Sequence, residues 1–178
     1  MGFSFEPVVP KLSKEDSFLD VNDIERSIQH LALAKAQSVA RGHPKALVIG
    51  ADTIVYCQKA ILGKPRDAIE ARDMLDLLNG KSHAVYSGIA LVCEEEKFSE
   101  SAVEKTIVTL RNIGDREIAE YIDATEYRDK AGAYAIQGRA MVFVSRIEGC
   151  FFNVVGLPID KTISLFMAYL NRKESADV

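Results

Sequence analysis

Residues 46–65, ALVIGADTIVYCQKAILGKP, contain the pattern that decides the fold. The β-branched run in its first four positions is typical of a buried strand, and Gly50 and Asp52 are expected to close that strand. Because a carboxylate is costly to remove from water, we expect Asp52 to lie at an open strand end. There, water or a cation can reach it.

The second half of the same stretch predicts a hairpin. Two strand pieces, Thr53 to Tyr56 and Ala60 to Leu62, flank a turn at Gln58-Lys59. Gly63-Lys64-Pro65 ends the hairpin. If the hairpin folds back, Lys64 comes close to Asp52. This pair is either a structural ion pair beside a turn or the acid and base of a site, and spacing alone leaves both interpretations open.

Length and charge narrow the class of protein. The 178 residues suit one domain with a real core, and the 48% hydrophobic and 27% charged composition is that of a globular chain. A net charge of -4 argues against a general nucleic-acid binder, which needs a broad basic surface. A small anionic ligand stays compatible with this charge, because a few local lysines can hold it.

The three cysteines, Cys57, Cys93 and Cys150, are too scattered for a disulfide framework or a zinc site. This use of cysteine favours a cytoplasmic location. No run reaches the roughly 18 apolar residues that span a bilayer, and residues 1–10 lack a secretory signal pattern. The sequence therefore predicts no membrane association.

A helix is expected over residues 20–41, capped by Asp20 or Asn22. Ile24, Ile28 and Leu31 share one stripe, and Lys35 falls inside that stripe. The lysine either lays its stem on the core with its ammonium in water, or reaches into a site beside the Asp52 strand. The first interpretation makes Lys35 structural and the second makes it functional.

The remaining chain alternates strands and helices. The apolar stripe of the last helix (Ile159, Ile163, Phe166, Met167 and Leu170) is expected to face the core. Ile69, Leu75 and Leu78 supply the apolar positions of the helix predicted from Asp67 to Asn79. The predicted segments are helix 67–79, strand 82–93, strand 101–110, helix 115–124, strand 140–147 and helix 159–170.

After the common catalytic motifs are excluded, the remaining candidate for chemistry is a carboxylate surrounded by lysines. The sequence lacks the GxxxxGK[ST] phosphate-binding loop, the GxGxxG dinucleotide-binding motif and the GxSxG motif of serine hydrolases. Its three histidines are not spaced as metal ligands. Asp52 suits hydrolysis of a phosphoanhydride, since lysines offset phosphate charge while the aspartate orients water or holds a divalent cation. The lysines concerned are Lys35, Lys64, Lys81 and Lys130.

Five ordered blocks resemble the Maf family of nucleoside triphosphate pyrophosphatases. They are GADTIV at 50–55, LGKP at 62–65, NGKSHAVYSGIAL at 79–91, DKAGAYAIQG at 129–138, and IEG with NVVGLP within 147–158. Lys35 in LALAKA also matches the lysine of the family's first conserved helix. The resemblance covers more than half of the chain.

The resemblance implies an α/β fold with a mixed central sheet, flanking helices and two lobes around a cleft. It also implies a hydrolase of nucleotide metabolism that cleaves a nucleoside triphosphate to the monophosphate and pyrophosphate with a divalent cation, Mg²⁺ or Mn²⁺. Asp52 matches the catalytic aspartate, and Lys35 and Lys64 match the phosphate-facing lysines. Thr53 and Gln137 resemble the subgroup that acts on dTTP and UTP. The metal ligands are not assigned.

One segment of the family is not found in this sequence. Family members begin with a strand that runs into an S-x-S-P-R-R loop, and residues 1–5 instead align with the family segment that lies beyond the first helix. Residues 1–178 then form a single Maf-like domain without the first strand and the start of the first helix. A late start, a truncation and a true loss are the three explanations.

Because each arginine contact to phosphate contributes about 1.5–3 kcal/mol, we expect this chain to be weakly active or inactive. The alternative function is therefore a nucleotide-binding or regulatory Maf-like protein linked to septum formation. The resemblance also makes a homodimer an expectation.

Overall fold

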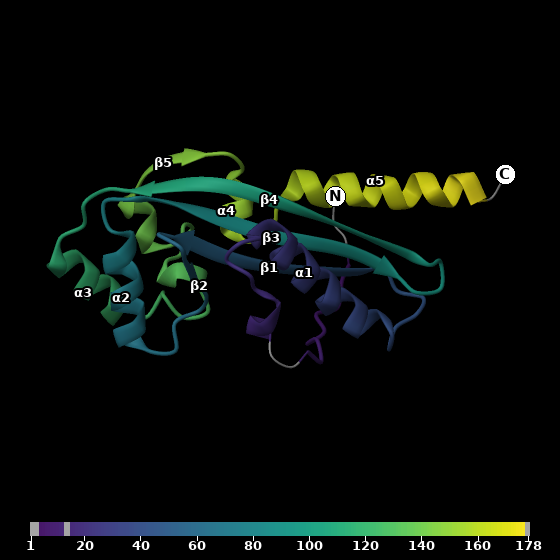
Figure 1. Cartoon of the computed structure of the whole chain (residues 1–178), viewed down its shortest axis with the longest axis horizontal. Helices are drawn as coiled ribbons and strands as arrows, with labels where there is room; N and C mark the ends of the chain where they lie inside the picture. The colour runs from purple at the N-terminus through teal and green to yellow at the C-terminus, as the bar shows by residue number, and fades with distance from the viewer. Residues whose placement is uncertain (1–3, 13–14, 177–178) are drawn as a thin grey trace.

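The computed structural model describes residues 4–12 and 15–176. Figure 1 shows a long twisted sheet with helices on both sides. The strands of the described residues run in the order β2-β1-β3-β4-β5. Their bounds are β1 (Val48–Cys57), β2 (Ala60–Leu62), β3 (Ser82–Cys93), β4 (Phe98–Leu110) and β5 (Val144–Glu148). The α/β class with helices flanking a central sheet is confirmed.

All four strand pairings are antiparallel, where the family resemblance implies a mixed sheet. Short turns explain two of the four pairings, β1–β2 and β3–β4, because a tight turn can join only antiparallel neighbours. Gln58 and Lys59 have φ of 49° and 67° and close the β1–β2 hairpin, as predicted. The turn at residues 94–97 joins β3 to β4.

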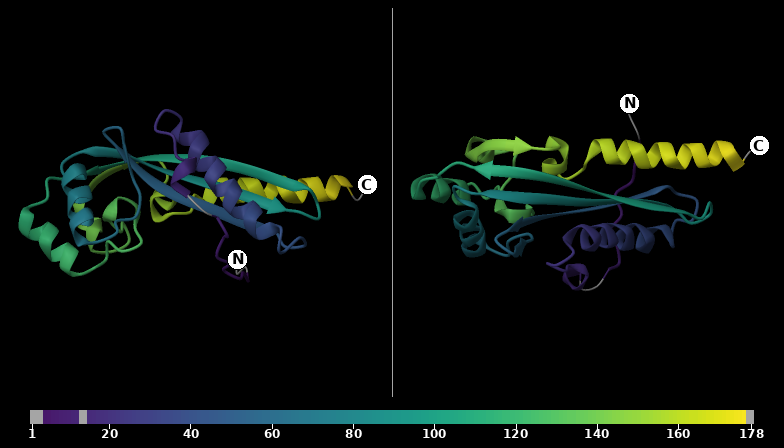
Figure 2. Two further views of the ribbon diagram at one scale, coloured as in Figure 1. Left: turned by 60° about the horizontal axis from the view of Figure 1, so that its bottom comes forward. Right: turned by 45° about the horizontal axis from the view of Figure 1, so that its top comes forward.

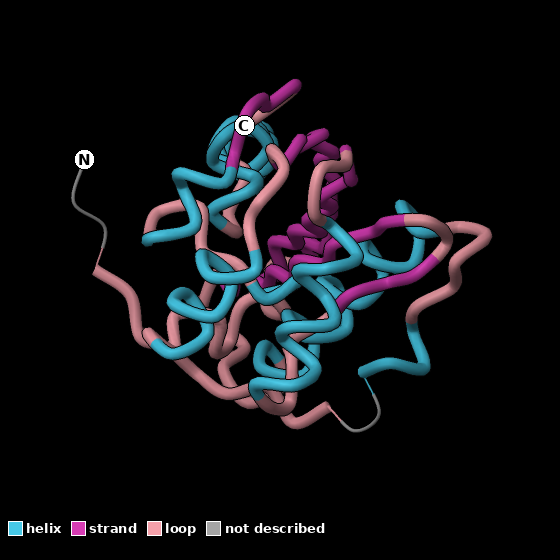
Figure 3. Tube along the Cα trace, turned by 90° about the vertical axis from the view of Figure 1, so that its left-hand side faces the viewer, coloured by secondary structure: helices cyan, strands magenta, loops and turns pink. Residues whose placement is uncertain are grey.

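Helices cover both faces of the sheet. The α-helices are α1 (Ile24–Ala40), α2 (Ala68–Leu78), α3 (Asp115–Asp123), α4 (Phe151–Val155) and α5 (Ile159–Ala176). Three short 3-10 helices are η1 (Glu15–Phe18), η2 (Ala131–Ala133) and η3 (Arg139–Phe143). In both views of Figure 2, α1 and α5 lie on opposite sides of the long strands, and the end-on view of Figure 3 shows helix on both sides of them.

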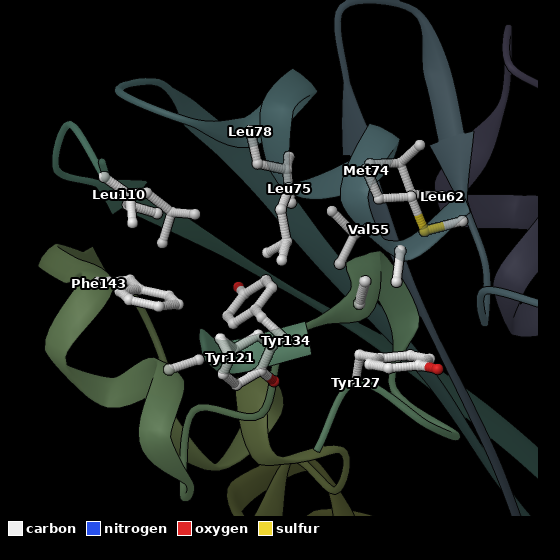
Figure 4. Packing of buried hydrophobic residues seen from close by; sticks show 14 of the residues in the cluster. Val55, Leu62, Met74, Leu75, Leu78, Leu110, Tyr121, Tyr127, Tyr134 and Phe143 are labelled. Carbon is white, nitrogen blue, oxygen red and sulfur yellow. The ribbon is translucent and has the colours of Figure 1, made fainter. Parts of the chain in front are cut away.

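Side chains of β1 and β3 alternate between these two faces. Ile54, Ala84 and Tyr86 pack with α1, whereas Val55 and Val85 pack with the cluster around α2, α3 and η2. Figure 4 shows the inside of that second cluster, where Leu75 of α2 points toward the ring of Tyr134. A third cluster joins α5 to the far halves of β3 and β4.

The predicted helices near residues 20–41 and 67–79 are confirmed, with shifted ends. Asp23, not Asp20 or Asn22, caps α1, because its carboxylate accepts a hydrogen bond from Arg26 N. Asp67 caps α2 by accepting from Glu70 N at 2.9 Å. Ile69, one of the apolar positions predicted for this helix, is 74% exposed. It lies two positions after the Asp67 cap, on the side of α2 away from Leu75.

Two predictions for the C-terminal third need correction. Strand pairing there covers only Val144–Glu148, because the preceding residues coil into η3. The apolar stripe predicted to face the core is largely exposed, because α5 packs on the sheet through Thr162, Leu165 and Tyr169 instead. Among residues 4–12 and 15–176, no helix is both long and apolar enough to cross a bilayer.

Candidate active site

Asp52 lies in the middle of β1, not at a strand end. It pairs with Gly88 of β3, and strand pairing continues on both sides of it. The prediction of a strand end is therefore wrong. Its carboxylate still reaches solvent, with a side chain 25% exposed, because β2 pairs only with Val55–Cys57. Within the described part of the chain, the β1 edge beside Asp52 has no second strand.

Asp52 shares a lysine with a second carboxylate. Lys35 Nζ lies 2.7 Å from Asp52 Oδ1 and 2.7 Å from Glu15 Oε2. The Lys35 side chain is 14% exposed. Burial alone would lower its pKa, but hydrogen bonds and charge from Asp52 and Glu15 outweigh burial, and the pKa of Lys35 is raised. Lys35 is therefore a fixed cation between two acids.

Two glycines allow α1 to approach the sheet closely enough for this contact. A Cβ on Gly88 would lie 2.2 Å from Ile28 O, and one on Gly50 would lie 2.5 Å from Ala32 O. Both glycines are on the face of the sheet that α1 covers, as is Asp52. Ile28 and Lys35 belong to the same helix, so this approach places Lys35 over Asp52. The prediction that Lys35 reaches the Asp52 strand is confirmed.

A pocket of about 210 Å³ opens beside Asp52. It gathers Asp52, Thr53 and Lys64, which the sequence predicts as site residues, together with Lys130. No ion pair joins Lys64 to Asp52 in the described residues, so the hairpin brings them to one pocket without pairing them. Lys81 lies elsewhere and donates to Leu77 O at 2.7 Å. Tyr134 and Gly156 also line the pocket.

A second hollow of about 560 Å³ adjoins the first. It lies between residues 4–10 and the unpaired edge of β1, and Lys35 and Gly50 line it. Ala51 lines both spaces. Sites for drug-sized ligands usually enclose about 300–1,000 Å³, so the smaller pocket alone is tight for a nucleotide and the two together are ample.

Thr53 points to the opposite face of β1 from Asp52. Its hydroxyl lies 2.7 Å from Ser87 Oγ and donates more weakly to Gly156 O at 3.4 Å. Ser87 is fully buried and also donates to Asn153 O at 3.3 Å. Thr53 therefore links the pocket to a network of neutral hydrogen bonds beneath α4.

Asn153 is the centre of that network. It is fully buried, and its Nδ2 donates to Val85 O and to Thr106 Oγ1, both at 3.0 Å. Thr106 Oγ1 in turn donates to Cys150 O and accepts from Cys150 N. One amide and one hydroxyl thus fasten α4 to β3 and β4, and α4 carries Val154 and Val155 into the pocket wall.

A sequence profile of the Maf family, described as Maf-like protein, matches residues 1–169. The chain belongs to the Maf family. Proteins named dTTP/UTP pyrophosphatase are similar to it over most of its length. That of Bacillus pumilus is 44% identical over 168 residues, which are 94% of this chain and 87% of the relative. That of Geobacillus sp. is 48% identical over 139 residues, 78% of this chain and 74% of the relative.

Gln137 does not line the pocket of this Maf chain. It is exposed on the turn of residues 136–138, in which Gly138 N donates to Ala135 O. Glu126 holds one side of the turn by accepting from Arg139 N at 2.7 Å, and Tyr121 holds the other by accepting from Ala135 N at 3.1 Å. The role of Gln137 toward a nucleobase stays a prediction.

Sequence reasoning missed Glu15 and Asn153. Glu15 lies in a polar segment where nothing marks one acid over its neighbour, and only the fold brings η1 against α1. Asn153 stands among apolar residues in FFNVV, and a lone amide in such a run could have indicated a buried hydrogen-bonding role.

His83 is buried on β3, and its Nε2 lies 2.8 Å from Tyr134 Oη. Burial lowers the pKa of His83 to about 4, so the ring is neutral at physiological pH. Tyr134 lines the pocket, so this pair supports the pocket wall from behind.

Proposed function

We propose that this Maf chain is a nucleoside triphosphate pyrophosphatase that hydrolyses dTTP and UTP to the monophosphate and pyrophosphate. The names of its relatives support the substrate class. The observation that carries the proposal is the 2.7 Å contact between Lys35 and Asp52 beside a pocket that holds two further lysines. A carboxylate next to convergent cations suits attack on a phosphoanhydride.

In the proposed reaction, water attacks the α-phosphorus. The bond between the α-phosphorus and the bridging oxygen breaks, the monophosphate forms, and pyrophosphate leaves with the bond's electron pair. Asp52 acts as the general base that accepts the proton of the water, or as a holder of the cation. Either role requires the carboxylate to be open to water, and its place on the unpaired edge of β1 provides this.

The lysines offset the negative charge of the triphosphate. The raised pKa of Lys35 keeps its ammonium charged throughout the neutral range. Lys64 and Lys130 face the pocket from two other segments of the chain. When phosphate oxygens approach, Lys35 can exchange a carboxylate partner for a phosphate, since both are anionic oxygen acceptors.

The oxygens of Asp52 and Glu15 suit a divalent cation. In the described residues no three His, Cys, Asp or Glu side chains gather as a ligand set. Mg²⁺, however, commonly uses one or two carboxylates and completes its shell with water and substrate phosphates. Two carboxylates that meet at one lysine fit that requirement, and we assign Mg²⁺ or Mn²⁺ to them. Such a cation polarises a phosphoryl oxygen and neutralises developing charge.

Two residues are proposed to select the base. The Thr53 hydroxyl lines the pocket, and the Gln137 amide can donate to and accept from a pyrimidine edge. Because Gln137 lies on an exposed turn outside the pocket, we expect it to contact the part of the nucleotide that extends beyond the pocket.

The proposal extends to the setting of the enzyme. We expect a cytoplasmic protein, because the three cysteines are unpaired thiols. The net charge of -4 favours a small nucleotide over nucleic acid as the partner. We also propose a homodimer.

Pyrophosphate release from a panel of nucleoside triphosphates with Mg²⁺ tests this function. We expect release from dTTP and UTP to exceed that from dATP, dGTP and 7-methyl-GTP, and to stop on chelation of the metal. Release that is equal across the panel would instead indicate a general pyrophosphatase. Nucleotide binding without release would establish the regulatory alternative.

A further inference from the structure

Residues 129–133, which include η2, have an unusual backbone conformation. Asp129, Gly132 and Ala133 have φ of 59°, 68° and 62°, in the left-handed region that suits glycine. A Cβ makes this region unfavourable, and alanine has no polar group to compensate with a local hydrogen bond. The segment therefore keeps this shape because its surroundings hold it, as is common for loops at functional sites.

The β1–β2 hairpin holds this segment in place. Gly132 N donates a hydrogen bond to Gly63 O at 3.0 Å. The fit is close, because a Cβ on Gly132 would lie 2.9 Å from Val55 Cγ2. Ala133 is fully buried in the cluster that contains Val55. Glycine at position 132 thus meets two requirements, the left-handed φ and the close contact with β1.

The contact between the two glycines joins the backbones of two pocket lysines. Lys64 directly follows Gly63, and Lys130 precedes Gly132 by two residues. Lys130 O also accepts a hydrogen bond from Ala133 N at 3.1 Å, so the short η2 turn fixes Lys130 relative to Gly132. The spacing between the two lysine backbones therefore depends on the hydrogen bond from Gly132 to Gly63.

The ammonium groups of both lysines are available to a ligand. Among the residues that the structure describes, the side chains of Lys64 and Lys130 take part in no hydrogen bond or ion pair. Asp52 and Asp129 line the same pocket without pairing with either lysine. Lys35, by contrast, is held by two carboxylates at 2.7 Å. The pocket thus offers two cations that an anionic ligand can engage.

We propose that Lys130 acts with Lys64 to bind the β- and γ-phosphates of the nucleotide. We call these two residues the lysine pair. Gly132 is the positioning residue that keeps their ammonium groups close enough to bind one pyrophosphate. This assignment rests on the proposed function and adds to it the part of the substrate that the lysine pair holds.

Charge decides which phosphates the lysine pair binds. The two terminal phosphates carry most of the negative charge of a nucleoside triphosphate, and the pyrophosphate gains more charge as it leaves. The cluster of Glu15, Lys35 and Asp52 has two acids for one cation, so without a metal ion it repels that charge. The lysine pair attracts it through charge-assisted hydrogen bonds. The α-phosphate then lies on the Asp52 side of the pocket, where water attacks.

Inorganic pyrophosphate is the probe for this site, because its binding requires no turnover. Isothermal titration calorimetry of the full chain with Mg²⁺ measures its affinity and that of dTMP, the product that lacks the terminal phosphates. Lys64→Ala and Lys130→Ala should each weaken pyrophosphate binding about tenfold or more, and should leave dTMP binding within about twofold of wild type. Lys45→Ala is the matched control, since it removes an equal charge from an exposed residue that lines neither hollow.

Gly132→Ala tests the positioning role. The new Cβ pushes the segment away from Val55 and displaces Lys130, so pyrophosphate binding should weaken about tenfold. Adding Lys130→Ala to this variant should then cost less than about threefold, because the displaced ammonium no longer contributes. A purely structural role of Gly132 predicts two independent losses instead. Circular dichroism checks folding, and Val55→Ala, which removes both methyl groups that the new Cβ meets, restores room if Gly132→Ala alone is unfolded.

Four results would overturn the proposal. They are a wild-type chain that does not bind pyrophosphate, a Lys130→Ala variant that binds it as tightly as wild type, an equal loss of dTMP and pyrophosphate affinity in that variant, and independent losses in the double variant. Failure of the proposed hydrolysis is a separate result. A chain that binds pyrophosphate through the lysine pair without cleaving dTTP retains the pair, and one that cleaves dTTP while Lys130→Ala binds pyrophosphate normally retains the hydrolysis alone.

Discussion

Asp52 and Thr53 are neighbours in β1, yet they face two different environments. Asp52 faces α1 and joins a charged cluster with Lys35 and Glu15 that is partly open to water. Thr53 faces α4 and joins neutral hydrogen bonds that lead to Ser87 and Asn153, both fully buried. One strand thus carries a reactive face and a supporting face.

The two faces of β1 differ in whether their polar groups can exchange one hydrogen-bonding partner for another. Water or phosphate oxygens can replace a carboxylate of the charged cluster without unfolding the chain, since all three side chains reach solvent. The buried network has no such substitute, because an unpaired polar group inside a protein costs about 1–3 kcal/mol. Substitutions in the charged cluster should therefore affect turnover, and those in the buried network should affect stability.

The largest expected effect comes from the close approach of α1. Gly88→Ala places a Cβ 2.2 Å from Ile28 O, so the helix must move away from the sheet. We expect the free energy of unfolding to fall by about 3 kcal/mol, with turnover falling as Lys35 leaves Asp52. Urea denaturation measures the loss. Gly63→Ala is the control, because a Cβ there meets nothing within 4 Å. Equal stability of both variants would contradict the close approach.

The next effect is a pH dependence from His83. Its pKa is about 4 in the folded chain and near 6.5 in the unfolded one, so the unfolded state takes up the proton first as pH falls. The contribution of neutral His83 is complete above pH 6.5 and is lost as pH falls toward 4. It amounts to about 2–3 kcal/mol.

Urea denaturation of wild type and His83→Gln between pH 7 and 4 isolates this contribution. Carboxylates titrate alike in both proteins, so the difference between them reports His83. We expect wild-type stability to fall more steeply with acid than that of the variant. Parallel curves would mean that the buried ring is protonated as easily as an exposed one.

Thr53→Val should affect stability less than Gly88→Ala or the titration of His83. The variant loses the hydrogen bond to Ser87 and leaves that buried hydroxyl short of a partner, which costs about 1 kcal/mol. Thr53→Ser keeps the hydroxyl and serves as the control. A thermal unfolding scan compares the three proteins. If valine is as stable as threonine, the network does not extend to the pocket.

Local patterns predicted the elements that bear the charged cluster. The hairpin after Asp52 is predictable from its β-branched runs and its turn, and the place of Lys35 is predictable from its position in the stripe of Ile24 and Ile28. The hairpin and the position of Lys35 on its helix each depend on residues that are close together in the sequence, so a local pattern can predict them.

Long-range features were not predictable in the same way. Glu15 reaches Lys35 only after η1 folds onto α1, and Asn153 bonds to strands 47 or more positions away. The strand edge beside Asp52 depends on where β2 stops pairing, which spacing does not determine. The last helix shows the opposite error. Helical periodicity reveals that Ile159, Ile163 and Met167 share an apolar face of α5, but it does not reveal that this face is exposed.

A direct comparison of Asp52→Asn with Thr53→Val tests the central claim that the two faces of β1 have different roles. Pyrophosphate release from dTTP with Mg²⁺ and thermal unfolding are measured for both variants. Asp52→Asn should lower kcat by about 10²–10⁴-fold with little change in Tm. Thr53→Val should lower Tm and raise KM while kcat stays within about threefold of wild type, since a neutral hydrogen bond is worth about 1 kcal/mol. Full turnover by Asp52→Asn, or a loss of kcat in Thr53→Val as large as that in Asp52→Asn, would contradict the assignment of chemistry to the Asp52 face.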